Sequence, residues 1–195
     1  MKVIEAKFLT AAPTPQALPE PSLPEAAFMG RSNVGKSSLI ASLTERKKLV
    51  RVSRRPGRTR AINFFRLDLD VGPVMLVDLP GYGYAEAPIE EQRRWGPLIT
   101  AYLRDRATLC LNVMLLDARR GPEDDDAGLL ALLAEFGRPT IVVATKIDKL
   151  PKAQRKLSLA RLSEGTGFRV LPFSAKTNEG LDLLWQVIGR SCGIL

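Results

Sequence analysis

The sequence has no histidine, only two cysteines and no long uncharged apolar run. The absence of histidine excludes a histidine general base and a histidine-bound metal. Cys110 and Cys192 have no metal-binding spacing and form no disulfide framework. No stretch approaches the ~20 apolar residues of a membrane-spanning helix, and charge near the N-terminus breaks any signal-peptide core. We therefore expect a cytoplasmic protein with no membrane partner.

The balance of charge is strongly positive. Lys and Arg number 29 against 21 Asp and Glu, a formal net charge of +8. Such an excess indicates an anionic partner such as nucleic acid, although it carries no information about the fold. With 195 residues, 45% of them apolar, the chain is long enough for one well-packed core. We expect a monomer.

The chain divides into two parts at about residue 25. Residues 1–25 predict a short strand at 3–9 and then a proline-rich loop or arm, because proline removes donors and blocks helix. Residues 26–195 predict the main domain, in which strands alternate with helices. The expected strands are 26–29, 61–69, 71–78, 109–117, 140–144 and 169–173. The expected helices are 37–45, 88–106, about 123–137, 151–164 and a last one around 181–188. This alternation predicts an α/β fold, a mostly parallel sheet with helices on both faces and one antiparallel edge strand.

A phosphate-binding motif lies between the first of these strands and its helix. Residues 30–37 read GRSNVGKS and match G-x-x-x-x-G-K-[ST]. Gly30 and Gly35 permit backbone turns that a side chain would block, and the amides converge on phosphate at the helix N-terminus. Lys36 reaches the β- and γ-phosphates, and the Ser37 hydroxyl ligates Mg²⁺. The alternative is a glycine-rich turn with a solvated lysine. The candidate phosphate-binding residues are Gly30, Arg31, Ser32, Asn33, Val34, Gly35, Lys36, Ser37 and Ser38.

A second phosphate-side motif, D-x-x-G, follows the apolar run at residues 74–77. It consists of Asp78, Leu79, Pro80 and Gly81. Asp78 is expected to hold Mg²⁺ through a water, and the Gly81 amide to meet the γ-phosphate. Alone, this tetrapeptide is as well explained by a plain turn after a strand. Downstream of a phosphate-binding loop, it indicates a nucleoside triphosphate site.

Two further strand ends predict recognition of guanine. Asp148, in the run Thr145, Lys146, Ile147, Asp148, can accept hydrogen bonds from guanine N1–H and the 2-amino group. Adenine offers neither, which disfavours an ATP-using enzyme. The stem of Lys146 would pack on the base, and amides of Ser174, Ala175 and Lys176 would meet the guanine oxygen. All four motifs should gather at the carboxyl edge of one sheet, where open α/β sheets bind ligands.

These motifs together resemble one family of small P-loop GTPases. The runs GRSNVGKSSLI at 30–40, PGRT at 56–59, NFF at 63–65, DLPGYGYA at 78–85 and TKIDKL at 145–150 are similar to the EngB (YihA/YsxC-type) bacterial GTPases. That family belongs to the TrmE-Era-EngA-YihA-Septin-like superfamily. The resemblance implies the small-GTPase fold, binding of GTP or GDP with Mg²⁺, and slow hydrolysis of GTP to GDP. It also implies a role in assembly of the large ribosomal subunit, and older descriptions link the family to cell division and septation.

The resemblance extends the candidate site to a first switch loop. Thr59 would ligate Mg²⁺ through its hydroxyl and touch the γ-phosphate through its amide. The residues of this loop are Gly57, Arg58, Thr59, Arg60 and Ala61. Together with Lys36 and Gly81, Thr59 would serve the hydrolysis step. Tyr82 stands where Ras-like enzymes place a glutamine that orients the attacking water, so we infer slow intrinsic hydrolysis.

Two expectations concern charge near the phosphates. Asn33 occupies a loop position that helps bind K⁺ in related GTPases, and equal GTPase rates in K⁺ and Na⁺ would exclude that role; the alternative is a turn residue.

Eight basic residues also crowd positions 46–60. We expect this cluster to contact ribosomal RNA of a pre-50S particle, whereas the scattered basic residues form a solvated surface. The competing hypothesis is a GTP-dependent protein-binding module in cell division with incidental hydrolysis.

Overall fold

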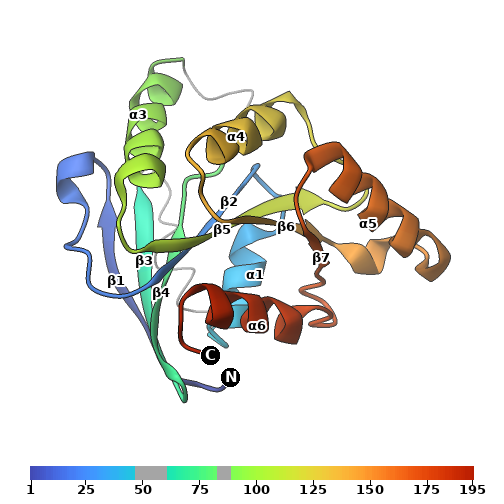
Figure 1. Cartoon of the computed structure of the whole chain (residues 1–195), viewed down its shortest axis with the longest axis horizontal. Coiled ribbons are helices and arrows are strands. Elements are labelled where there is room, and N and C mark those ends of the chain that lie inside the picture. Colours follow the sequence, from blue (N-terminus) through green and yellow to red (C-terminus); the bar gives the residue numbers. More distant parts are fainter. Residues whose placement is uncertain (47–60, 83–88) are drawn as a thin grey trace.

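The computed structural model describes the chain apart from residues 47–60 and 83–88, and it describes only the backbone of residues 89–95. Figure 1 shows strands and helices alternating along the chain. The strands are β1 (Val3–Ala12), β2 (Glu25–Gly30), β3 (Ile62–Leu69), β4 (Gly72–Asp78), β5 (Leu109–Asp117), β6 (Thr140–Thr145) and β7 (Val170–Pro172). The α-helices are α1 (Lys36–Leu43), α3 (Ile89–Asp105), α4 (Asp124–Glu135), α5 (Lys152–Thr166) and α6 (Leu181–Ser191). Two short 3-10 helices are η1 (Pro15–Ala17) and η2 (Ile147–Lys149).

The strands form one sheet in the order β1-β3-β4-β2-β5-β6-β7. Pairing is parallel from β4 across to β7, whereas β3 runs antiparallel to both β4 and β1. The strand β3 returns into β4 through the two residues Asp70 and Val71, and Gly72 follows at φ +133°, a backbone region that favours glycine. The expected mostly parallel α/β sheet with an antiparallel element at one edge is confirmed.

Two layers of helices cover the sheet because successive strand residues point to opposite faces. In β2, Ala26 and Phe28 pack with α1 and α6, whereas Ala27 and Met29 pack with α3, α4 and α5. All six residues of β2 are buried, as expected of a central parallel strand covered on both sides. Both helical layers are visible on either side of the sheet in Figure 1.

The N-terminal strand is longer than expected and the arm after it is held in place. The strand β1 pairs with β3 from Val3 to Ala12, past the predicted end at residue 9. The arm then leads from this edge strand to β2, and the carbonyl of Pro19 in it accepts a 2.7 Å hydrogen bond from Arg106 Nη1. No helix within the described ranges is both long and apolar enough to cross a membrane.

A buried ion pair fastens this arm to the end of α3. Glu25 is 1% exposed and Arg106 is 7% exposed, and Arg106 Nη2 lies 2.6 Å from Glu25 Oε1. The hydroxyls of Tyr102 and Thr108 each donate to the same carboxylate at 2.8 Å. The carboxylate is therefore surrounded by donors from α3 and from the short connection between α3 and β5.

Candidate nucleotide-binding site

The phosphate-binding loop connects β2 to α1, as its sequence predicts. Gly30 ends β2 at φ +155°, and a Cβ built there would lie 2.9 Å from the Leu115 carbonyl oxygen. Gly35 precedes α1 at φ +112°. Both positions therefore require glycine, Gly30 for close approach to β5 and Gly35 for the turn into the helix. The loop consequently ends with amides at a helix N-terminus, where an anion is favoured.

The D-x-x-G segment lies against this loop. The Lys36 ammonium donates to the Asp78 carboxylate and to the Leu79 carbonyl, and both charged side chains are about one-tenth exposed. The carboxylate that ends β4 is therefore next to the lysine that begins α1. One residue beyond Gly81, the Tyr82 carbonyl accepts a 3.0 Å hydrogen bond from the Ser32 amide. The structure thus brings the two predicted phosphate-side motifs together, with Pro80 and Gly81 between these contacts.

Thr145 connects the base-side motif to the phosphate-binding loop. Its side chain is buried, and Oγ1 lies 2.6 Å from the Val34 carbonyl oxygen and 3.1 Å from that of Leu116. A hydroxyl carries one hydrogen, so it donates to one of these acceptors at a time. The hydroxyl of Thr145 therefore holds the loop against the ends of β5 and β6.

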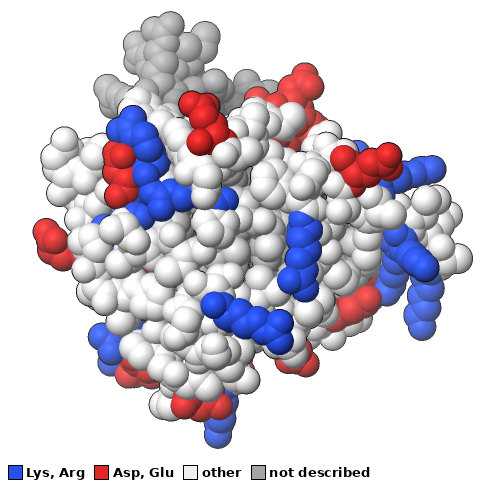
Figure 2. All heavy atoms as spheres, in the orientation of Figure 1, with Lys and Arg blue, Asp and Glu red and all other residues white. Residues whose placement is uncertain are grey.

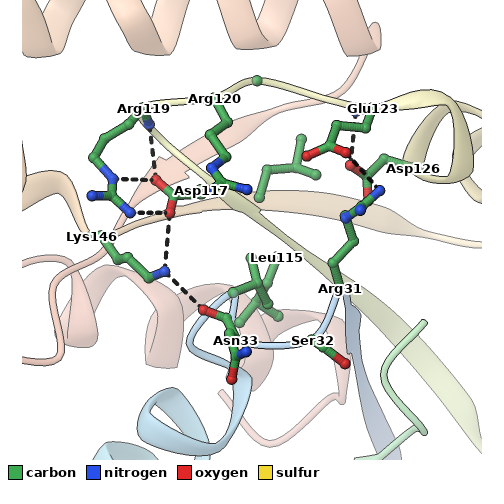
Figure 3. Close-up of a pocket in the computed structure, with 13 residues that line it drawn as sticks. Arg31, Ser32, Asn33, Leu115, Asp117, Arg119, Arg120, Glu123, Asp126 and Lys146 are labelled. Atoms are coloured by element: carbon green, nitrogen blue, oxygen red, sulfur yellow. Dashed lines mark hydrogen bonds and ion pairs between the residues drawn. The ribbon is translucent and has the colours of Figure 1, made fainter. Parts of the chain in front are cut away.

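Lys146 makes a second connection between the same two segments. Its backbone is left-handed at φ +59°, and its ammonium lies 2.8 Å from the Asn33 carbonyl and 3.0 Å from Asp117 Oδ2. Asp117 also accepts two guanidinium hydrogen bonds from Arg119, as Figure 3 shows. Burial raises the pKa of Asp117, but the hydrogen bonds from Arg119 and Lys146 outweigh burial and hold it well below its usual range.

Asp148 and Ser174, which belong to the two predicted guanine-side motifs, lie in direct hydrogen-bond contact. Ser174 is fully buried, and its hydroxyl donates a 2.7 Å hydrogen bond to Asp148 Oδ1. The same hydroxyl oxygen accepts hydrogen bonds from the backbone amides of Lys176 and Thr177. The hydrogen bond from Ser174 is the main cause that lowers the pKa of Asp148. The carboxylate is therefore ionised at neutral pH. Ala175 and Lys176 are exposed beside it, whereas Ile147 is buried in the core.

A cavity of about 100 Å³ lies between the phosphate-binding loop and the segment joining β5 to α4. On one side of it, the Arg31 guanidinium lies 2.8 Å from Glu123 Oε2 at the start of α4 (Figure 3). Asp117, Glu123 and Asp126 were not among the expected site residues. Asp117 had a usable signal, because it ends a predicted strand at the same sheet edge as the motifs.

Part of the expected site lies outside the described residues. This applies to Gly57, Arg58, Thr59 and Arg60, whereas Ala61 is described and directly precedes β3. Residues 47–60 also contain seven Lys and Arg and no acid, so most of the chain's net charge of +8 falls there. On the face in Figure 2, Lys and Arg are interspersed with Asp and Glu, with a group of basic residues at the right, where Figure 1 places α5.

Comparison with known proteins defines the class and the family. A family model described as "50S ribosome-binding GTPase" matches residues 25–146, and with the strand–loop–helix geometry it defines a P-loop GTPase. A probable GTP-binding protein EngB from Syntrophus aciditrophicus is 44% identical over 195 residues, covering 99% of this chain and 98% of the relative. Its counterpart from Pelobacter propionicus is 46% identical, covering 97% and 95%. The chain belongs to the EngB family of GTP-binding proteins, and GTP hydrolysis is its activity.

The solved structures agree with this assignment. The crystal structure of a probable GTP-binding protein engB superposes with a TM-score of 0.70 at 29% identity, covering 86% of this chain and 98% of that one. The expected family, fold and GTPase activity are therefore confirmed.

Proposed function

We propose that this GTPase binds GTP and Mg²⁺ at the carboxyl edge of its sheet and acts as a switch in assembly of the large ribosomal subunit. The observation that carries the nucleotide part is the convergence of four strand ends. Phosphate-side groups at the ends of β2 and β4 and base-side groups at the ends of β6 and β7 lie along one edge. Open α/β sheets bind ligands at this edge.

The phosphate side provides a lysine and two oxygen donors. Lys36, which donates to Asp78 and Leu79, would bind the β- and γ-phosphates, and the Gly81 amide would meet the γ-phosphate. Ser37 and, through a water, Asp78 would hold Mg²⁺, with Thr59 as the further ligand that the family implies. The donor chemistry fits, because Mg²⁺ prefers oxygen and uses one or two protein groups beside phosphates and water. When bound, the ion neutralises charge that develops on the phosphates.

The base side provides a carboxylate that is already oriented. Asp148, held by the Ser174 hydroxyl, would accept from guanine N1–H and the 2-amino group. The stem of Lys146 would cover the base, and amides at Ser174, Ala175 and Lys176 would meet its oxygen. Adenine lacks both donors in this geometry, so the site rejects it.

The ribosomal part of the proposal is supported by charge and by the description of the family model. Residues 47–60 are strongly basic, and the matching family is described as ribosome-binding. A basic segment next to the switch threonine would make contact with the RNA of a pre-50S particle depend on the bound nucleotide. K⁺ at Asn33, a role in cell division, a cytoplasmic location and a monomeric state stay predictions.

A variant that binds xanthosine nucleotides in place of guanosine nucleotides tests both the nucleotide part and the ribosomal part of the proposal. Asp148→Asn should lose affinity for GTP by about 10²-fold or more, because one acceptor becomes a donor facing guanine, and should gain xanthosine triphosphate. The exposed Asp182→Asn at the start of α6 is the matched control. Affinities are measured by titration with Mg²⁺, and binding to pre-50S particles by co-sedimentation with non-hydrolysable analogues.

The two readouts separate the two claims. We expect the Asp148→Asn protein to sediment with particles in the presence of the xanthosine analogue and not the guanosine analogue. Unchanged GTP affinity would overturn the base site. A correct nucleotide switch with sedimentation that ignores it would overturn the ribosomal role alone.

A further inference from the structure

The residue that follows the D-x-x-G motif is anchored inside the protein. Tyr82 is 8% exposed, and its ring packs among the buried residues beneath α3 and α4. Its hydroxyl lies 2.6 Å from Asp126 Oδ1 and 3.3 Å from the sulfur of Met114. The side chain therefore points into the core, which agrees with its inability to orient water as a glutamine does.

The partner of this hydroxyl is an almost completely buried carboxylate. Asp126 is 1% exposed, and its other oxygen accepts a 2.9 Å hydrogen bond from the backbone amide of Glu123. Glu123 is the N-cap residue of α4, so this hydrogen bond is part of the cap of the helix. Burial, and then the hydrogen bond to Asp126, raise the pKa of Tyr82 far above its ordinary value. The tyrosine thus stays a donor at physiological pH. A hydrogen bond to a charged group is among the stronger ones in proteins.

The backbone of Tyr82 is held from the other side by the phosphate-binding loop. Its carbonyl accepts from the Ser32 amide at 3.0 Å, and Tyr82 pairs with Arg31 in a parallel β-bridge. Arg31 itself points toward Glu123, beside Asp126, as Figure 3 shows. Tyr82 is consequently held on both sides, by the phosphate-binding loop and by α4.

We propose that Asp126 is a positioning residue, which acts through Tyr82 to place the Gly81 amide for the γ-phosphate. Consecutive Cα atoms are ~3.8 Å apart, so Gly81 cannot move far while Tyr82 is held. The inference rests on the proposed function of Gly81. Its consequence is specific: Asp126 contributes to binding GTP, which has a γ-phosphate, and not to binding GDP.

Two conservative variants and a control test this role. Tyr82→Phe keeps the buried ring and removes the hydroxyl, and Asp126→Asn keeps the shape and removes the charge. Asp124→Asn, an exposed acid in the same first turn of α4, is the control. Dissociation constants for GDP and for a non-hydrolysable GTP analogue are measured with Mg²⁺, beside thermal melting to establish that each variant is folded.

The expected result is a change in the ratio of the two constants. Tyr82→Phe and Asp126→Asn should each weaken analogue binding about tenfold, the size expected when a charge-assisted hydrogen bond is lost. GDP binding should change by less than about twofold, and the double variant should be no worse than the more affected single one, because both act on the same Tyr82–Asp126 hydrogen bond. The control should match the unmodified protein.

Other outcomes overturn the proposal. Equal weakening of GDP and analogue would mean a merely structural role, and an unchanged ratio in folded variants would mean that Asp126 does not position Gly81. If Tyr82→Phe fails to fold, Asp126→Asn decides alone, together with hydrogen exchange. With the analogue bound, the Gly81 amide should exchange faster in Asp126→Asn than in the unmodified protein, and equal exchange would refute the idea. Failure of the underlying site would show differently, as absence of binding by the unmodified protein.

Discussion

Removal of the buried Arg106 guanidinium should strongly destabilise the fold. In Arg106→Met, the Glu25 carboxylate, 1% exposed, would keep the hydroxyls of Tyr102 and Thr108 but lose its only counter-charge among the described residues. The Pro19 carbonyl would also lose its donor. Breaking one side of a buried ion pair costs about 3–5 kcal/mol. This is a large part of the 5–15 kcal/mol or so that stabilises an ordinary domain.

Arg104→Met, two residues earlier and in the last turn of α3, is the matched control. Arg104 pairs with Asp105, but both side chains are more than half exposed, and such pairs contribute little. Urea unfolding followed by circular dichroism should show a much lower midpoint for Arg106→Met and an unchanged midpoint for Arg104→Met. If Arg106→Met unfolded at the midpoint of the control, the pair would not hold the arm, and our account of this edge would be wrong.

Two further predictions concern single hydroxyls at the site. Thr145→Val keeps the shape of the side chain but removes the hydroxyl that donates to the carbonyls of Val34 and Leu116. The free energy of unfolding should therefore fall by about 1–3 kcal/mol in denaturant titrations. An unchanged free energy of unfolding would contradict the anchoring role of this hydroxyl. Ser174→Ala should raise the pKa of Asp148 toward its ordinary value, as measured by carboxyl NMR titration. Because the folded-state pKa is lowered, Asp148 stabilises the native state above its unfolded pKa and loses this contribution as pH falls through the folded pKa. The variant should therefore lose less stability on acidification below about pH 4, and an unchanged pKa would show that Ser174 is not the cause.

The elements of the main domain were predictable because local patterns specify them. The glycines at 30 and 35, the apolar runs of β5 and β6, and the acids after Pro122 all indicate structure within a few residues. Boundaries were less accurate where a single backbone conformation decides them. Helix α1 ends at Leu43 and not at the predicted residue 45, because Glu45 takes a left-handed backbone at φ +54°.

The contacts that support the site could not be predicted in the same way. Tyr82 and Asp126 are 44 residues apart, and Glu25 and Arg106 are 81 apart. Pairing over such distances depends on which strand ends become neighbours, and therefore on the order of strands in the sheet. In a single sequence, Asp126 is indistinguishable from the exposed acids beside it, although it alone of that run is buried.

The two connections made by Thr145 and Lys146 have a consequence for how affinity arises. They join the segment that we propose reads the base to the loop that we propose holds the phosphates. A nucleotide bound in this way would behave as a bivalent ligand, because the first half to bind brings the second to a high effective concentration. The covalent link through the ribose would thereby become part of the recognition.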